Sequence, residues 1–133
     1  MRVVADTNVY ISALNFGGTA EEVLALGRAQ AIQLFLSPPV LKEIEGVLIG
    51  KFKWSAKRAR QAIAAIQEFT QLVHPKETLD VITEDEPDNR ILECTLEAKA
   101  EVVITGDDHL QQLKMFRGIP IMGPREFLEI YRA

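Results

Sequence analysis

Val102-Val103-Ile104-Thr105-Gly106-Asp107-Asp108-His109 is the stretch that decides the fold, because an apolar β-branched run is followed at once by glycine and acids. A run of this length and composition predicts a buried strand that Gly106 ends. The amino terminus has the same arrangement, with a predicted strand over 2–5 and Asp6 directly after it. An acid in that place has little local reason to be there. Both strand ends are therefore candidate functional positions.

Strands and helices are predicted to alternate along the rest of the chain. Further strands are predicted over 32–36, 72–74 and 120–122. Helices are predicted after Thr19 (an N-cap with Glu22 three residues on), from Ser37-Pro38-Pro39 to Gly50, after Ser55, after the acidic loop 84–89, and from Pro124. No Asn-Gly or Asp-Gly hairpin signal occurs. The alternation predicts an α/β fold, a three-layer α/β/α sandwich with a mostly parallel central sheet.

Length and composition predict a single domain over residues 1–133. The chain is 47% hydrophobic and 26% charged, which is ordinary for a globular domain with a real core. No apolar stretch approaches the ~18 residues of a membrane helix, so no membrane association is expected. The one cysteine, Cys94, allows no internal disulfide, which favours a cytoplasmic location. Its apolar neighbours predict that it is a buried small side chain.

Four carboxylates are expected to meet at one edge of the sheet. Asp6 and Asp107 follow strands, while Glu43 and Asp88 lie near the starts of helices. Ligands of parallel α/β sheets bind beyond the carboxyl ends of the strands. Gathered carboxylates repel one another unless a cation lies among them, and oxygen ligands suit Mg²⁺ or Mn²⁺. The pattern predicts a metal site that activates water against a phosphate ester.

Simpler interpretations of these residues remain open from the sequence alone. Asp88 and Asp108 are each compatible with an ordinary helix N-cap. Glu43 is compatible with a solvated charge on a helix face. His74 and His109 are compatible with surface histidines that bind nothing.

One segment of this acidic protein is strongly basic. The net charge is −4, but residues 1–75 carry +2 and residues 76–133 carry −6. A basic stripe without acids lies between residues 51 and 60, beside Phe52 and Trp54, and consists of Lys51, Lys53, Lys57, Arg58 and Arg60. The stripe is either a phosphate-binding surface or a solvated helix start, and the two aromatic rings are either core anchors or a platform for bases.

Four segments, in order and at matching spacing, resemble the PIN-domain family, in particular its VapC-like toxins of toxin–antitoxin systems. They are Val3–Val9, Ser37–Ile44, Glu86–Leu92 and Val103–Leu110. The resemblance covers nearly the whole chain. It implies an α/β/α fold and metal-dependent endoribonuclease activity that leaves a 3′-hydroxyl and a 5′-phosphate. It also implies RNA as substrate and a protein antitoxin as partner. A homodimer is a further assembly that the sequence leaves open.

The resemblance implies catalytic and metal-binding roles for Asp6, Glu43, Asp88 and Asp107, with Glu43 either a ligand or the base that orients water. It implies that Thr7, Asn8 and Thr105 support the site. Independently of the resemblance, the charge of the basic stripe leads us to expect that it contacts RNA phosphates or the antitoxin. The chain departs from the family at one point. Many members carry an acid two residues after the position of Asp107, where this chain has His109, while Asp108 supplies an acid one residue earlier.

Two other functions fit parts of the sequence. A haloacid-dehalogenase-like phosphatase also places an Asp after its first strand, but it requires a second Asp where Asn8 stands. A catalytically decayed PIN-fold interaction module would be expected to lack one of the four acids, and all four are present. Metal binding separates the decayed module from the enzymes, and a substrate panel separates the nuclease from the phosphatase.

Overall fold

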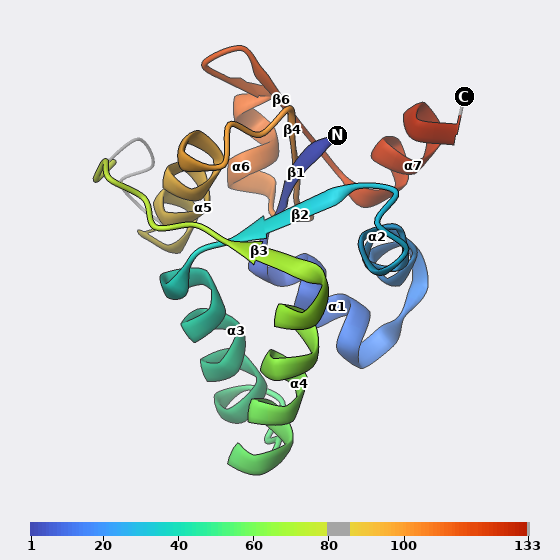
Figure 1. Ribbon diagram of the computed structural model, residues 1–133, viewed down its shortest axis with the longest axis vertical. Coiled ribbons are helices and arrows are strands. Elements are labelled where there is room, and N and C mark those ends of the chain that lie inside the picture. Colours follow the sequence, from blue (N-terminus) through green and yellow to red (C-terminus); the bar gives the residue numbers. More distant parts are fainter. Residues whose placement is uncertain (80–85, 133) are drawn as a thin grey trace.

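The computed structural model describes residues 1–79 and 86–132, and its strands and helices alternate along the chain (Figure 1). The strands are β1 (Arg2–Ala5), β2 (Gln33–Leu36), β3 (Thr70–Leu72), β4 (Val102–Ile104), β5 (Met115–Phe116) and β6 (Ile119–Met122). The helices are α1 (Thr7–Phe16), α2 (Gly18–Arg28), α3 (Pro38–Gly50), α4 (Ala56–Phe69), α5 (Glu86–Glu97), α6 (Asp108–Leu113) and α7 (Pro124–Arg132). The predicted α/β class is confirmed.

The described strands form one sheet in the order β3-β2-β1-β4-β6-β5, and every neighbouring pair except β5–β6 is parallel. The chain steps outward from β1 to β2 and β3, then returns across the sheet to β4 and β6. Parallel crossovers are right-handed, so these two directions put helices on opposite faces. Figure 1 shows α1, α3 and α4 on one side of the sheet and α5 and α6 on the other. The result is the predicted three-layer sandwich.

The centre of the sheet is where the strand order reverses. In β1, Val3 lies opposite Leu34 of β2 on one side and Val102 of β4 on the other. The connections leaving the carboxyl ends of β1 and β4 diverge to opposite faces, which opens a crevice beyond the strand ends. Asp6 and Asp107 follow these two strands, so the topology itself directs them to that crevice.

The core is continuous on both faces of the sheet. Strand residues such as Val4 and Ile104 and helix residues such as Tyr10 and Leu92 are almost fully buried. Cys94 is buried among them as predicted, and burial raises the pKa of its thiol to about 12. No helix in the described ranges has both the length and the apolarity needed to cross a membrane.

The first two helices differ from the sequence prediction. Asp6-Thr7-Asn8 opens α1, a helix that was not predicted, because nearly all of its sides are buried and its apolar residues show no simple stripe. Thr19 was predicted as the N-cap of the next helix, and this is wrong. The turn between α1 and α2 uses Gly17 and Gly18, both at positive φ (75° and 65°), and α2 has already begun at Gly18.

The helix α5 and the strand β6 also differ from the sequence prediction. The helix α5 begins at Glu86, so residues 86–89 of the predicted acidic loop are helical, while Glu84 and Asp85 lie outside the described residues. The strand predicted over 120–122 is β6, and it forms a hairpin with β5. Both turn residues, Arg117 and Gly118, have positive φ (49° and 82°), which is typical of a tight type I′ turn. A search for Asn-Gly or Asp-Gly misses this hairpin because Arg117 occupies the first turn position.

Candidate active site

Asp6 is fixed by hydrogen bonds to both of its carboxylate oxygens. It follows β1 and is the N-cap of α1, where Oδ1 accepts a hydrogen bond from the backbone N–H of Thr7 (2.6 Å). Oδ2 accepts one from the hydroxyl of Thr105 (2.6 Å), the residue that follows β4. The residue is only 4% exposed. Hydrogen bonds to a carboxylate are short and strong, so the Asp6 side chain has one well-defined orientation.

Thr105 joins the ends of the two central strands. Its hydroxyl donates to Asp6 and also accepts a hydrogen bond from the backbone N–H of Asp107 (2.9 Å). Asn8 makes a second connection between α1 and the loop after β4, because its Oδ1 accepts a hydrogen bond from the backbone N–H of Gly106 (3.1 Å). These contacts hold the loop after β4 against the start of α1. Asn8 and Thr105 are two of the residues for which the resemblance implied a supporting role, and these are the contacts that they make.

Asp107 is the N-cap of α6. Its Oδ1 accepts a hydrogen bond from the backbone N–H of Leu110 (3.1 Å) and lies 4.0 Å from Nδ1 of His109. The side chain is 27% exposed, so it remains open to the pocket after this capping contact. Capping therefore fixes the direction of the carboxylate without occupying it fully.

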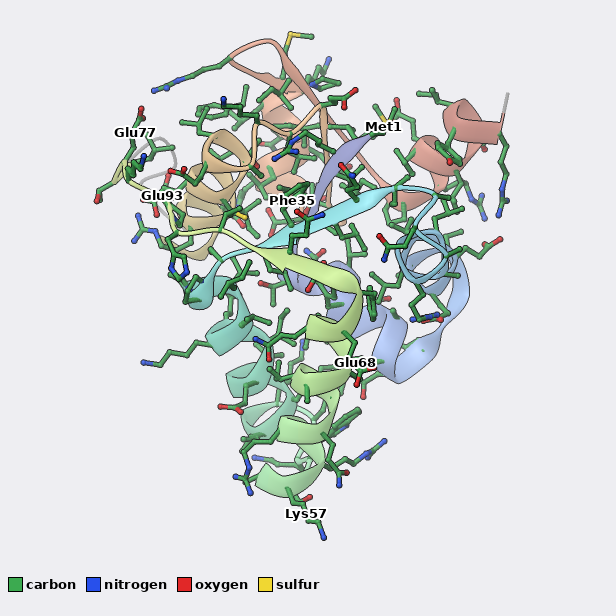
Figure 2. All side chains as sticks on the ribbon, viewed as in Figure 1. Met1, Phe35, Lys57, Glu68, Glu77 and Glu93 are labelled. Atoms are coloured by element: carbon green, nitrogen blue, oxygen red, sulfur yellow. The ribbon has the colours of Figure 1, made fainter. Side chains whose placement is uncertain are left out.

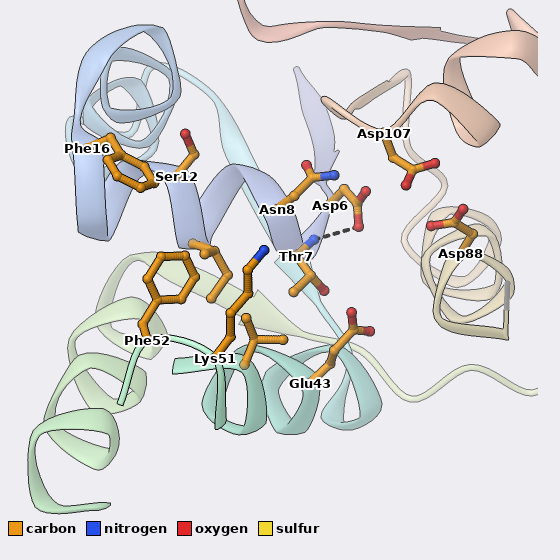
Figure 3. Close-up of a pocket in the computed structure, with 12 residues that line it drawn as sticks. Asp6, Thr7, Asn8, Ser12, Phe16, Glu43, Lys51, Phe52, Asp88 and Asp107 are labelled. Atoms are coloured by element: carbon orange, nitrogen blue, oxygen red, sulfur yellow. Dashed lines mark hydrogen bonds between the residues drawn. The ribbon is translucent and has the colours of Figure 1, made fainter. Parts of the chain in front are cut away.

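The other two acids reach the same space from helices on opposite faces of the sheet. Asp88 is on α5 and is almost fully buried, while Glu43 is on α3 and is half-buried. Figure 3 shows both carboxylates directed towards Asp6 and Asp107. We call these four residues the acidic wall. They are drawn from four separate parts of the chain, and the topology brings them to one place.

The acidic wall lines a pocket of about 510 Å³. The lining residues are Asp6, Thr7, Asn8, Ile11, Ser12, Phe16, Glu43, Val47, Lys51, Phe52, Asp88 and Asp107. Opposite the acidic wall lies a group that we call the aromatic rim, made of Phe16, Lys51 and Phe52 (Figure 3). The two phenylalanine rings meet edge to face with centroids 6.1 Å apart, and Nζ of Lys51 lies 5.6 Å from the Phe52 ring.

Phe16 and Ser12 were not among the predicted site residues. Both are on α1, which the sequence analysis did not identify as a helix. The signal that could have found it is Asp6 itself, since Asp is a favoured N-cap and a mostly apolar segment follows it. Phe16 is 76% exposed, a high value for a large apolar side chain beside an acidic pocket.

The basic stripe is divided by the structure. Lys51 lines the pocket, whereas the other four cations are not among its lining residues. Arg58 stacks its guanidinium on the Trp54 ring, 3.6 Å from the centroid, and the Trp54 indole N–H donates to Oδ1 of Asn15 (3.2 Å). Figure 2 shows Lys57 at the end of the α3–α4 pair farthest from the sheet. Phe52 and Trp54 both pack partly against the core, which agrees with the core-anchor interpretation.

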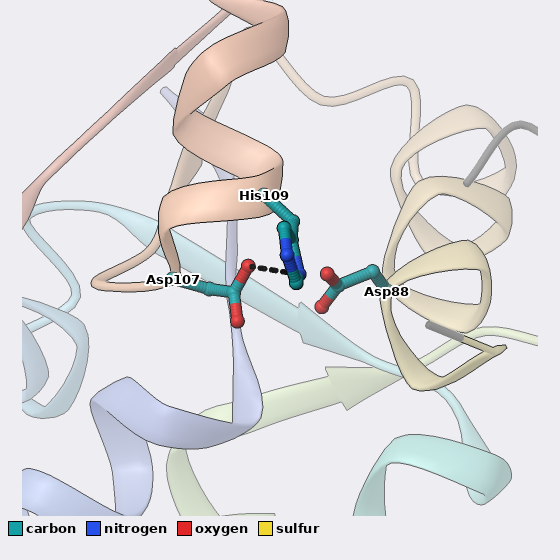
Figure 4. Close-up of side chains that lie close together, drawn as sticks. All are labelled: Asp88, Asp107 and His109. Atoms are coloured by element: carbon teal, nitrogen blue, oxygen red, sulfur yellow. Dashed lines mark ion pairs between the residues drawn. The ribbon is translucent and has the colours of Figure 1, made fainter. Parts of the chain in front are cut away.

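The acids and His109 form a donor set that fits a divalent cation. Asp88, Asp107 and His109 each offer one ligand atom, and these atoms all lie within 4.8 Å of one another (Figure 4). Asp108, the neighbouring acid, is not in this group, and neither Asp108 nor His109 is among the residues that line the pocket. The remaining oxygens of the acidic wall face the same space, and carboxylate oxygens are what hard divalent cations require. Bringing so many acids together without a cation is electrostatically unfavourable.

Comparison with known proteins identifies the family. Residues 2–109 match the model of the PIN domain. The chain is 33% identical over 119 residues to the uncharacterized protein MJ1680 of Methanocaldococcus jannaschii, an alignment that covers 86% of this chain and 76% of that protein.

A solved structure shares the fold. It is the crystal structure of VapBC2 from Rickettsia felis bound to a DNA fragment from their promoter, with a TM-score of 0.68 over 92% of this chain and 98% of that chain. Identity is 16%, so the similarity concerns the fold alone. The family match covers most of the sequence and agrees with the resemblance seen in its motifs. We conclude that this chain belongs to the PIN-domain family.

Proposed function

We propose that this protein is a metal-dependent endoribonuclease. The observation that carries the proposal is the acidic wall, four carboxylates from separate parts of the chain that line one open pocket. Membership of the PIN-domain family supports the nuclease class. Asp6 has a structural part as the N-cap of α1, and the same bonds hold its buried carboxylate in one orientation beside the other acids of the pocket, as a metal ligand requires.

Asp6, Asp88 and Asp107 are the residues that would hold the cation, and Glu43 is either a further ligand or the base for water. The chemistry that bound Mg²⁺ or Mn²⁺ supplies at such a site is activation of water and stabilisation of negative charge on a phosphate. Glu43 is half-buried on α3 and lines the pocket across from Asp88, so it is placed to accept a proton within the pocket. Thr105 keeps Asp6 and the Asp107 backbone in register during the reaction.

We propose that RNA enters over the aromatic rim. Lys51 places a positive charge beside the acidic wall, where it can contact a phosphate next to the bond that is cut. The exposed ring of Phe16 offers a surface for an unpaired base, and base–aromatic stacking contributes about 1–3 kcal/mol per base. The other members of the basic stripe (Lys53, Lys57, Arg58 and Arg60) are assigned to RNA farther along the strand or to a protein antitoxin.

We further propose that the protein is the toxin of a toxin–antitoxin pair. The VapBC2 structure that shares its fold supports this assignment. Co-expression with the product of the neighbouring reading frame should give a stable complex without ribonuclease activity. Removal of that partner should release the activity.

The central test measures cleavage of a single-stranded RNA with and without Mg²⁺ or Mn²⁺. We expect Asp6→Asn and Asp107→Asn to lose at least about 10²-fold in rate, because even outer-shell partners of metal sites cost roughly 10–100-fold. Glu45→Gln is the matched control, since Glu45 is on α3 two residues from Glu43 and does not line the pocket. Equal cleavage by the wild type, Asp6→Asn and Asp107→Asn would exclude a metal nuclease at this site. Hydrolysis of a phosphomonoester in place of RNA would favour the phosphatase, and absence of metal binding would favour the decayed module.

A further inference from the structure

We propose that His109 is a nitrogen ligand of the ion held by Asp88 and Asp107, and that the site therefore selects a first-row transition ion over Mg²⁺. This inference rests on the metal dependence proposed above and adds a ligand of different chemistry. The sequence left open whether Asp108 or His109 completes the acidic wall.

The geometry favours His109 over Asp108. A ring nitrogen of His109 and one oxygen each from Asp88 and Asp107 lie within 4.8 Å of one another, and Asp108 is outside this group. An ion with ligand distances of about 2.0–2.2 Å joins donors up to roughly 4.4 Å apart, so a small side-chain rotation closes the set. Figure 4 shows the His109 ring between the two carboxylates.

The three donors come from only two helices, α5 and the start of α6, which limits how far the donors can separate. Asp107 caps α6 through Leu110 N–H, and His109 is the second residue of that same helix. Asp88 approaches from α5 and is almost fully buried. The His109 side chain is 54% exposed, which leaves the solvent side of the ion open for water or substrate oxygens. An open ligand position is what a catalytic site requires.

A mixed carboxylate–imidazole set changes the metal preference. Mg²⁺ takes oxygen ligands in strict octahedral geometry, whereas imidazole nitrogen suits first-row transition ions. Replacing a third carboxylate by imidazole also removes one negative charge, which weakens the attraction for both ions, but Mn²⁺ accepts the nitrogen donor better than Mg²⁺ does. Of the two ions predicted from the sequence, the donor set therefore favours Mn²⁺.

Pulsed electron paramagnetic resonance of bound Mn²⁺ tests the nitrogen ligand directly. The chain contains two histidines, so an imidazole nitrogen signal can be assigned by two substitutions. We expect the ¹⁴N modulation in the wild type and in His74→Gln, whose exposed side chain is outside the group formed by Asp88, Asp107 and His109. We expect its loss in His109→Gln. Bound Mn²⁺ without ¹⁴N modulation in the wild type would overturn the inference and leave the proposed nuclease intact.

Titration calorimetry at pH 8 then tests the selectivity. His109→Asp restores an all-carboxylate set, and we expect it to reduce the ratio of Mn²⁺ to Mg²⁺ affinity by about tenfold or more. An unchanged ratio would overturn the inference even if the variant cleaves RNA. If the wild type binds neither ion, the inference and the proposed function both fail. Circular dichroism of His109→Gln and His109→Asp checks that both variants are folded.

Discussion

The acidic wall and the aromatic rim face each other across one pocket, but different forces hold them. Asp6 and the backbone of Asp107 are tied through the Thr105 hydroxyl by bonds of 2.6 and 2.9 Å. The rim is held by an edge-to-face ring contact between Phe16 and Phe52 and leaves Phe16 76% exposed. Hydrogen bonds to charged groups fix direction, whereas exposed rings can adapt to what they contact. This difference suits the roles proposed above, with chemistry at the fixed carboxylates of the wall and contact with RNA at the adaptable rings of the rim.

The largest effect that tests this contrast is expected from Thr105→Val. The change keeps the shape but removes the donor to Asp6 and the acceptor for Asp107 N–H. We expect cleavage to fall about 10–100-fold and the free energy of unfolding to fall by roughly 1.5–3 kcal/mol. Single-turnover cleavage and urea denaturation measure the two effects.

Thr95→Val is the matched control, because Thr95 is equally buried but donates to the Ile91 carbonyl within α5. It should lose about 1 kcal/mol of stability and keep its cleavage rate. A similar loss of cleavage in both variants would mean that the Thr105 effect is general destabilisation and that the wall does not depend on its hydroxyl.

Phe16→Ala is expected to act on the rim alone. Loss of a stacking surface should weaken binding of single-stranded RNA by about 1–3 kcal/mol, with little change in metal affinity. Fluorescence anisotropy with Ca²⁺ in place of Mg²⁺ or Mn²⁺ measures RNA binding. The control is Met115→Ala, which removes an exposed apolar side chain of similar size from β5. Unchanged RNA affinity with weaker antitoxin binding would reassign Phe16 to the protein partner.

Lys51→Gln should have a smaller and salt-dependent effect. The affinity for RNA falls as salt rises, so the slope of log affinity against log salt is negative. If Lys51 contacts one phosphate, its replacement should make this slope shallower by ~0.7 for a single strand. The triple change Lys53→Gln, Lys57→Gln and Arg60→Gln should reduce the slope further if the stripe follows the RNA beyond the pocket. A wild-type slope in the triple variant, together with weaker antitoxin binding, would limit RNA contact to Lys51 and the rim.

The smallest effect is expected on the metal-free stability of Asp107→Asn. The amide oxygen can still accept the Leu110 N–H, so the cap of α6 is kept while one of several crowded negative charges is removed. The melting temperature without metal should hold or rise by a few degrees, since about 1 kcal/mol corresponds to roughly 3–5 °C at this size. Added Mn²⁺ should stabilise the variant less than the wild type. A clear drop in the metal-free melting temperature would show that Asp107 is structural.

The sequence predicts the wall better than the rim, for a physical reason. Asp6 directly follows one short β-branched run, Asp107 follows another after a single glycine, and a parallel sheet brings such positions to one edge. Phe16 lies at the end of a helix that is buried on most sides, so its apolar residues lack the stripe that marks a surface helix. The ligand role proposed for His109 depends on where α5 lies relative to α6, and the sequence carries no local signal for the approach of these two distant segments.

The hydrogen bond from the Thr105 hydroxyl also determines when the site can form during synthesis and folding. Its partner Asp6 lies 99 residues earlier in the chain, and the bond needs β4 to be paired beside β1. Pairings between such distant segments form late, because closing a long loop must precede any gain from the contact. During synthesis on the ribosome, Asp6 therefore emerges long before the residues that orient it. A nascent chain of this protein therefore carries its first acid without the partner that orients it, and the nuclease activity proposed above requires that nearly all of the chain is available to fold.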